Sequence, residues 1–380
     1  MARIAYALSG QGRGHASRVL AMADALGRRG HEILFMCGGT AFEVLSSRVR
    51  NVVELPCLKQ VVRGNRLSIT RTLLQNKKLI FNRPRIVKDT AEILAGFGPD
   101  LVITDFEAFT PMAADRLGIP VLSFNHQEIV TRTRYSLPLR YHVHALLTRT
   151  AIRLVAPRSP VHTLLTSFYF PHVKDAAATT LVRPIIRPAV TSLVPRDDGH
   201  VLVYFNQSSG SEFVLDALRR TNARFVVYNF AEPVGERYDN IAFKGASVDE
   251  FLDDLAGCTA VISTAGFTLM SEALYLGKPI MVVPNNGIFE QTLNALFLQM
   301  EGLGAAVFNR SIRADDVTAF LERRTEFARR IRGRAGSGNM DAVYCIERVL
   351  RNTGATLVPL PAPPQPAAII AETLAPSANG

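Results

Sequence analysis

The segment Ala260–Val283 restricts the fold more than any other part of the chain. It opens with the apolar run 260–262, turns through the small residues 263–266 and continues in a helical pattern over 268–276. A glycine ends that pattern before a second apolar run begins at position 280. A buried strand, a helix and a second buried strand in this order form the repeating unit of a parallel sheet covered by helices.

The turn of this unit can hold an anion. Gly266 lets the backbone approach a ligand, and the free N–H groups that follow lie at the positive end of a helix, which suits a phosphate. One turn later, Glu272 can accept hydrogen bonds from vicinal hydroxyls such as those of a ribose, and Glu290 and Gln291 could hold sugar hydroxyls. For the glycine turn taken alone, an ordinary βαβ unit with an exposed Glu272 remains the simpler alternative.

A second glycine turn stands near the N-terminus. An apolar strand over 3–8 leads into Ser-Gly-Gln-Gly-Arg-Gly-His15, and a helical pattern follows over 16–26. Such a loop can also belong to a dinucleotide site. That site needs an acidic residue after the next strand, 32–36, where Cys-Gly-Gly stands instead.

Three predicted strands end in polar side chains. His15 follows the first strand, Asp105 closes the apolar run 99–105, and His126 and Glu128 follow the strand 120–124. The carboxyl ends of parallel strands line one crevice, so we expect these groups to gather there.

Strands and helices alternate in both halves of the 380-residue chain, a length that favours two domains. Further patterns predict helices over 42–47, 67–97 with a break near Pro84, 110–117, 137–155, 212–221, 248–256, 313–332 and 340–352, and strands over 52–55, 200–205, 225–228, 241–243 and 305–308. We therefore predict an α/β protein with two Rossmann-like domains, 1–190 and 191–335, facing each other across a cleft. The helix within 336–358 could pack back on the first domain, and 359–380, with six prolines and no aromatic residue, is expected to be disordered.

The groups Thr-Ala-Gly266, Ser-Glu-Ala-Leu274, Gly-Lys-Pro279, Pro284, Glu-Gln291 and Asn-Ala295 follow one another at a restrictive spacing. They resemble the donor-binding motif of GT-B glycosyltransferases, especially MurG-type and UDP-glycosyltransferase-like enzymes. The loop ending at His15 looks like the N-terminal loop of the same enzymes. The resemblance covers residues 1–350, and it is weak between 59 and 174.

The resemblance implies an inverting transfer of a sugar from a nucleotide-diphosphate donor, a UDP-sugar, to a hydroxyl. In that pattern Glu272 binds the nucleotide ribose, and Glu290 and Gln291 contact the donor sugar. The diphosphate would rest on the turn of the C-terminal domain, with help from a facing polar turn; these residues are Gly266, Phe267, Thr268, Ser208 and Ser209. The backbone of 244–248 is where such enzymes hold the base.

By the same resemblance, the N-terminal domain binds the acceptor. His15 is the best catalytic base, because an imidazole titrates near neutral pH, and Asp105 could accept a hydrogen bond from its other nitrogen. A helix cap or turn residue is the alternative for Asp105. The predicted acceptor-side residues are Gly12, Arg13, Gly14, His126 and Glu128.

We expect no metal and no cofactor. The chain has no Asp-x-Asp motif, and the pair Asp253-Asp254 falls in a helical pattern where it would face solvent. The four cysteines are scattered, which argues against a zinc site or a disulfide framework.

Positive charge is concentrated in the first half of the chain. The net charge is +10, and the segments 55–88 and 129–174 hold nine and seven Lys/Arg residues without one acidic residue. Apolar residues are interleaved, so an anionic membrane surface is the first choice of partner. A solvated basic face is the simpler alternative, and nucleic acid comes second because no recognition motif for it is present.

No apolar run reaches the roughly 18 residues that span a membrane, and 1–8 is too short for a signal-peptide core. We therefore expect a cytoplasmic enzyme on the inner face of the cell membrane, acting on a lipid or another small-molecule acceptor. Two other functions stay open: a nucleotide-sugar 2-epimerase-like enzyme, and a non-catalytic nucleotide-sugar-binding subunit.

Overall fold

The computed structural model of the protein describes residues 1–11, 13–59, 61–63, 66–67, 69–205, 212–230, 237–308, 312–334 and 336–354. Three residues predicted for the site, Gly12, Ser208 and Ser209, lie outside these ranges, as does the predicted tail 359–380. The side chain of Arg13 is also outside the described part.

Seven strands of the N-terminal half form one parallel sheet in the order β11–β9–β7–β6–β1–β2–β3. The strands are β1 (Arg3–Leu8), β2 (Glu32–Cys37), β3 (Val52–Glu54), β6 (Leu101–Asp105), β7 (Val121–Asn125), β9 (His162–Thr166) and β11 (Thr179–Val182). Apolar side chains of this sheet belong to two separate core clusters, one on each face. Burial on both faces is why its central strands are almost continuously apolar.

A second seven-stranded sheet, in the order β14–β15–β13–β12–β16–β17–β18, belongs to the C-terminal half. Its strands are β12 (His200–Tyr204), β13 (Arg224–Tyr228), β14 (Arg237–Tyr238), β15 (Ile241–Lys244), β16 (Ala260–Ser263), β17 (Ile280–Val282) and β18 (Gly304–Ala306). All pairs run in parallel except the edge pair β14–β15. The two sheets confirm the predicted pair of Rossmann-like units.

Helices surround both sheets. In the N-terminal half they are α1 (Arg13–Gly27), α2 (Gly39–Ser46), α3 (Ile69–Phe81), α4 (Arg83–Phe97), α5 (Thr110–Leu117), α6 (Ile129–Arg132), the 3-10 turn η1 (Leu139–Tyr141), α7 (His142–Val155) and α8 (Pro188–Thr191). In the C-terminal half they are α9 (Glu212–Arg219), α10 (Val248–Gly257), α11 (Phe267–Tyr275), α12 (Phe289–Met300), α13 (Ala314–Glu322), α14 (Arg324–Arg332) and α15 (Asn339–Asn352). Two short ladders pair β4 (Val62–Arg63) with β5 (Arg66–Leu67) and β8 (Thr133–Arg134) with β10 (His172–Val173).

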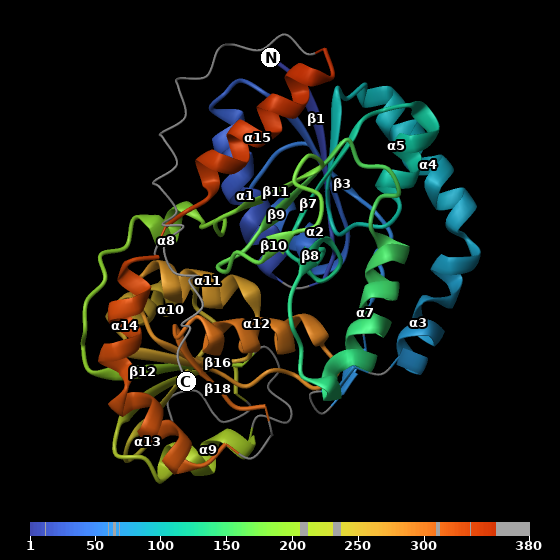
Figure 1. Ribbon diagram of the computed structural model, residues 1–380. Coiled ribbons are helices and arrows are strands. Elements are labelled where there is room, and N and C mark those ends of the chain that lie inside the picture. The colour runs from blue at the N-terminus through green and yellow to red at the C-terminus, as the bar shows by residue number, and fades with distance from the viewer. Residues whose placement is uncertain are drawn as a thin grey trace, which may run out of the picture.

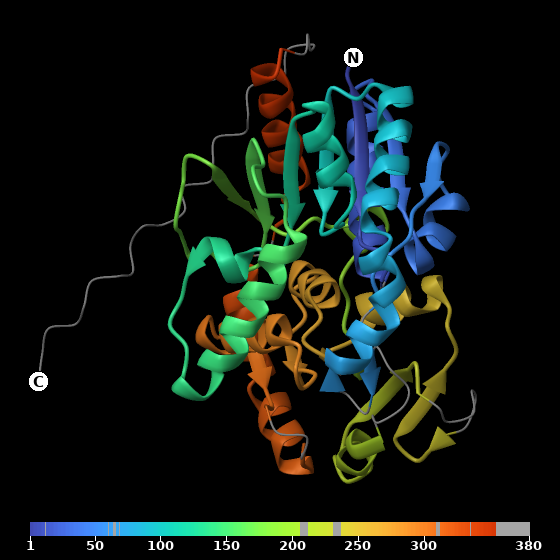
Figure 2. The ribbon, with the colours of Figure 1, turned by 90° about the vertical axis from the view of Figure 1, so that its right-hand side faces the viewer.

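The two sheets lie one above the other, with α11 and α12 between them (Figure 1, Figure 2). The last helix, α15, returns to the N-terminal half and lies beside α1 (Figure 1). Its side chains share a core cluster with β1 and α1, and Glu347 forms an ion pair with Arg29 at 2.8 Å. The chain therefore crosses between the two halves twice.

The two crossing segments are bonded to each other. The amide of Asn339 accepts from the backbone N–H of Ile186 at 2.9 Å and donates to the carbonyl of the same residue at 2.7 Å. A Cβ on Gly338 would lie 2.1 Å from the carbonyl oxygen of Arg183, so a glycine is needed where the segments meet. These contacts tie the two crossings into one connection.

Several element boundaries differ from those that the sequence predicts. The break expected near Pro84 lies at Asn82, where α3 and α4 meet, whereas the helix expected over 313–332 without a break divides at Arg323. The strands β9 and β11 and the helix α12 were not predicted. The polar residues at the start of α12 fit ligand contacts, but Glu290 also fits the first turn of a helix, where an acidic residue is favoured.

The prediction that Asp254 faces solvent is wrong, whereas Asp253 has a mostly exposed side chain. Asp254 is buried and accepts hydrogen bonds from the hydroxyl of Tyr228 at 2.6 Å and the ammonium of Lys244 at 2.7 Å. Both donors stand at the carboxyl ends of strands. A carboxylate can be buried here because two donors compensate its lost hydration.

Candidate active site

His15 and Asp105 are in contact, which the sequence had left open. Leu8, the last residue of β1, pairs with Asp105 at the end of β6, so the loop after β1 passes over the carboxylate. His15 stands in the first turn of α1, and its Nδ1 lies 3.0 Å from Oδ1 of Asp105. Asp105 is fully buried, while the His15 side chain keeps 14% of its surface exposed. A carboxylate only accepts, so Nδ1 donates to Asp105, and the lone pair that can take a proton is on Nε2.

Arg18 completes this group. Its Nε and Nη2 atoms lie 3.1 and 2.6 Å from Oδ2 of Asp105, and Nη2 also lies 2.6 Å from Oδ1. Burial alone would raise the pKa of Asp105, but the charges and hydrogen bonds of Arg18 and His15 outweigh it and hold that pKa below its usual value. The carboxylate is therefore ionised and can orient the imidazole.

The start of α11 lies directly against this group. Gly266 is the N-cap of the helix, in an extended conformation, and Phe267 and Thr268 form its first turn. A Cβ on Gly14 would lie 2.6 Å from Oγ1 of Thr268, so the N-termini of α1 and α11 meet at this glycine. Two helix N-termini that meet present N–H groups and partial positive charge to one place.

The sequence suggested that Glu272 projects into the open cleft, but the structure buries it. Its carboxylate is almost fully buried and forms a two-point ion pair with Arg187, with Oε1 to Nε at 2.7 Å and Oε2 to Nη2 at 2.9 Å. Burial raises the pKa of Glu272 above its usual value, although Arg187 acts in the opposite direction. A ribose that binds this carboxylate must therefore share it with an arginine from the crossing segment.

Glu290 and Gln291 begin α12 and differ in environment. Glu290 is half-buried, and its charge acts on the catalytic side of the helix, where it opposes the lowering of the His126 pKa that burial causes. Gln291 is buried, and its Oε1 accepts a hydrogen bond from the backbone N–H of Asn285 at 2.9 Å. Gln291 thus holds the loop before α12, and Glu290 is the freer of the two for a sugar.

The predicted acceptor contacts of His126 and Glu128 are not supported, because both side chains are buried. Oε2 of Glu128 lies 3.0 Å from Nε of Arg132, and its Oε1 accepts from Asn125 at 3.0 Å. The residue between them does reach the site: Nε2 of Gln127 lies 3.4 Å from Nε2 of His15. Docking of the two halves covers His126, which the sequence could not show.

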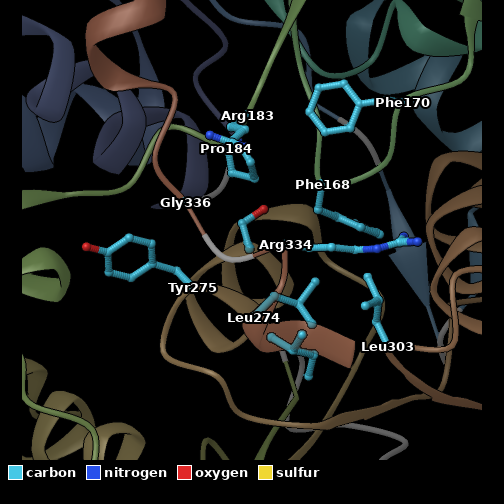
Figure 3. A pocket seen from close by; sticks show the side chains of 11 residues that line it. Phe168, Phe170, Arg183, Pro184, Leu274, Tyr275, Leu303, Arg334 and Gly336 are labelled. Atoms are coloured by element: carbon cyan, nitrogen blue, oxygen red, sulfur yellow. The ribbon is translucent and has the colours of Figure 1, made fainter. Parts of the chain in front are cut away.

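A small cavity beside the crossing segments is a different feature (Figure 3). Phe168 and Pro184 line it from the N-terminal half, and Leu274, Tyr275 and Leu303 from the C-terminal half. Its volume of about 30 Å³ holds one or two water molecules, so it is too small for a nucleotide. Among the described residues there is also no group of three or more His, Cys, Asp or Glu placed to hold a metal ion.

A family model described as glycosyl transferase family 1 matches residues 2–324, which include both sheets and the whole site. The chain belongs to this family. It is therefore a glycosyltransferase of the GT-B type, as the motif over 264–295 had indicated.

Curated relatives agree with this assignment. An uncharacterized glycosyltransferase of Methanosarcina acetivorans is 24% identical over 321 residues, which are 78% of this chain and 83% of the relative. The UDP-N-acetylglucosamine–N-acetylmuramyl-(pentapeptide) pyrophosphoryl-undecaprenol N-acetylglucosamine transferase of Chelativorans is 28% identical over 218 residues, 50% of this chain and 57% of the relative.

Solved structures share the fold at low identity. The glycotransferase of kitacinnamycin has a TM-score of 0.67 at 16% identity and covers 91% of this chain and 98% of its own. MurG of Acinetobacter baumannii has a TM-score of 0.63 at 16% identity, with 92% and 100% covered.

Two arginines of the site in this glycosyltransferase were not among the residues that the sequence predicts. Arg18 could have been found, because it stands three residues after His15 and therefore on the same face of the helix. Arg187 gave no local signal, since its partner Glu272 is 85 residues away and the two meet only where the crossing segment passes α11.

Proposed function

We propose that this glycosyltransferase is an inverting, metal-independent enzyme that moves a sugar from a UDP-sugar to a hydroxyl of a membrane lipid. The observation that carries the proposal is the position of His15, which is bonded to the ionised Asp105 and stands where α1 meets α11. A catalytic base and a binding site for the leaving diphosphate thus lie next to each other.

In this mechanism His15 acts as the general base. Its Nε2 takes the proton of the acceptor hydroxyl while the oxygen attacks the anomeric carbon of the donor sugar. Asp105 accepts from Nδ1, keeps the ring in the required tautomer and stabilises the imidazolium that forms. Attack opposite the departing diphosphate inverts the configuration at that carbon.

The leaving diphosphate is stabilised by backbone N–H groups at Gly266, Phe267 and Thr268 and by the positive end of α11. This stabilisation needs no metal, which is why we propose metal independence. Glu272 is proposed to hold the ribose together with Arg187, and Glu290 to contact the sugar. UDP is chosen because the Chelativorans relative is named as a UDP-N-acetylglucosamine enzyme.

The lipid acceptor is supported by exposed apolar residues on α3 and the segment η1–α7, which lie on the same side of the molecule in Figure 1. Exposed side chains include Phe81 at 83%, Leu139 at 85%, Val143 at 68% and Leu154 at 73%. None of the helices in the described ranges is long and apolar enough to cross a membrane. Exposed apolar groups on short helices instead suit binding at a membrane surface.

Cations border the apolar side chains of α7. Burial lowers the pKa of Lys174, and so do the charges of Arg149, Arg153, Arg134 and Arg132 around it. Of these, Arg132 is paired with the buried Glu128. Crowded cations attract anions, so we propose that this face binds anionic lipids on the inner side of the cell membrane.

The donor site is tested by melting temperature in the presence of UDP, dTDP, GDP, ADP and CMP. A nucleotide at 100 times its dissociation constant should stabilise the wild type by about 2.7 kcal/mol. UDP should raise the melting temperature most, and the effect should shrink in Glu272→Ala. If no nucleotide raises it, the proposed donor site is wrong.

Turnover separates this function from its two alternatives. His15→Ala should lose transfer to an added acceptor while it keeps its affinity for UDP. Interconversion of donor sugars without an acceptor would instead indicate a 2-epimerase, and nucleotide binding without any turnover a binding subunit.

The membrane surface is tested by sedimentation with vesicles. The protein should sediment with anionic vesicles at low salt and be released at high salt, because screening weakens charge attraction between exposed groups. Equal binding to neutral vesicles, or none to either, would contradict the proposed membrane contact and leave the donor site untouched.

A further inference from the structure

His126 lies between the two halves of the molecule. It follows β7 and is fully buried. Its Nδ1 lies 2.7 Å from the carbonyl oxygen of Thr166, at the end of β9, and its Nε2 lies 2.9 Å from Oδ1 of Asn294 in α12. Both neighbours are acceptors and a neutral imidazole has one N–H, so the ring donates to one of them at a time; the hydrogen bond to the C-terminal half forms when Nε2 carries the hydrogen.

Asn294 connects this contact to the donor side. Its Nδ2 donates to the carbonyl of Ala265 at 3.1 Å, directly before the N-cap of α11. A carbonyl only accepts, so the amide nitrogen must face Ala265, and the oxygen must face His126. The orientation of the Asn294 amide is thereby determined on both sides.

The imidazole also packs on the first residue of α11. The rings of His126 and Phe267 are stacked, with centroids 3.7 Å apart and planes 12° apart. The peptide groups of Ala265 and Phe267 flank the N-cap Gly266, so His126 acts on both sides of the turn proposed to hold the diphosphate. This turn is thus positioned from the N-terminal half.

Aromatic rings extend the contact between the halves. Phe168 lies 6.1 Å from Phe267 in a stacked arrangement, and Tyr169 stacks on Phe297 with centroids 3.8 Å apart. These side chains belong to one apolar cluster that contains residues of both halves. The contact between His126 and Asn294 supplies a directional polar link within this cluster.

We propose that His126 and Asn294, together called the latch, are positioning residues that hold the N-terminus of α11 in register with His15. This inference rests on the proposed function, because it assigns the latch a role in donor binding. Gly14 and Thr268 show how close the fit is, since a Cβ on Gly14 would lie 2.6 Å from Oγ1 of Thr268. A displacement between the two helix ends would move the proposed diphosphate site away from its fixed position beside His15 and weaken donor binding.

The test uses His126→Phe, Asn294→Ala and the double variant in the full-length protein. Phenylalanine keeps a ring to stack on Phe267 but removes both polar contacts of His126. The matched control is His162→Phe: His162 is also buried, and its Nε2 lies 2.8 Å from Oγ1 of Thr180, so its contact stays within the N-terminal half. Asn294→Ala covers the case in which His126→Phe fails to fold.

Each latch variant should raise the UDP dissociation constant about tenfold, equivalent to about 1.4 kcal/mol, at a temperature well below its melting point. The double variant should be no worse than either single variant, because both remove the same link. The donor KM should rise in step, with a smaller change in kcat. His162→Phe should lose stability but keep its UDP affinity.

Hydrogen exchange of the amides in 267–275 tests the latch without any nucleotide. Exchange should be at least tenfold faster in the latch variants than in the wild type and in His162→Phe. If UDP does not bind the wild type, the proposed function fails and this measurement alone decides about the latch. Unchanged exchange together with unchanged UDP affinity in both latch variants would overturn it, and so would equal changes in His162→Phe.

Discussion

The buried pair of Arg18 and Asp105 makes the sharpest stability prediction. The Arg18 side chain is 5% exposed and the Asp105 side chain 0%, and they share contacts of 2.6 and 3.1 Å. Arg18→Met keeps most of the apolar volume of the side chain but removes its charge. The carboxylate of Asp105 is then left in the interior with His15 as its remaining ionisable partner.

Breaking a buried ion pair by removing one partner destabilises a protein by about 3–5 kcal/mol, because an uncompensated charge stays buried. The matched control lies at the end of the same helix: Arg28, directly after α1, and Asp24 form an ion pair with side chains 73% and 44% exposed. Such an exposed pair contributes about 0–1 kcal/mol, so Arg28→Met should be nearly neutral.

Urea denaturation followed by circular dichroism measures the difference, since the chain has no tryptophan for fluorescence. Arg18→Met should unfold at clearly lower urea than Arg28→Met. The double variant Arg18→Met/Asp105→Asn should recover much of the loss, because no unpaired charge then remains.

Acid adds a second readout for the same variant. The pKa of Asp105 lies below its usual value, so the stability it contributes is present above the unfolded pKa of about 3.9 and is lost as the pH falls through the folded pKa. Removal of Arg18 should raise that folded pKa and shift the loss to higher pH. If Arg18→Met and Arg28→Met are equally stable at neutral pH, the reasoning about this pair is refuted.

Two further predictions concern the contact of α1 with α11 and the buried histidine. Gly14→Ala should lower kcat/KM at least tenfold, because the new Cβ would lie 2.6 Å from Oγ1 of Thr268. The control Gly27→Ala on the same helix should be neutral, because its Cβ meets no atom within 4 Å. Equal activity of the two variants would contradict the close approach of the two helices. Burial lowers the pKa of His126, so the stability that its neutral ring contributes is present above the unfolded pKa of about 6.5 and is lost as the pH falls toward the folded pKa. The difference in melting temperature between the wild type and His126→Phe should therefore shift in favour of the variant from pH 7 to pH 5. A difference that stays constant over this range would argue against the burial effect.

The sequence predicted the fold class because its signals are local. Strands such as Leu101–Asp105 and Ala260–Ser263 are buried on both faces of a sheet. Their apolar residues are therefore continuous rather than alternating, and such a run can be recognised in the sequence. The glycine turns after β1 and β16 likewise marked the two places where strands give way to helices. Helix α12 was missed because its first residues fit a ligand motif as well as they fit a helix start.

The sequence also placed His15 and Asp105 at one edge of the predicted sheet, but it left open whether they are in contact. Both stand at carboxyl ends of strands, and a parallel sheet brings such ends to one edge. The pairing of Leu8 with Asp105 then brings the side chains of His15 and Asp105 into contact, although they are 90 residues apart in the sequence.

Contacts between the two halves were decided only by the tertiary structure. The sequence indicated that His126 and Glu272 were polar residues near a cleft, but it carried no information on how one sheet would dock on the other. Docking buries His126 against Asn294 and brings the crossing segment with Arg187 onto Glu272. Secondary structure follows from neighbours along the chain, whereas these burials depend on the relative placement of the two sheets, and that placement is determined by the packing of the whole interface.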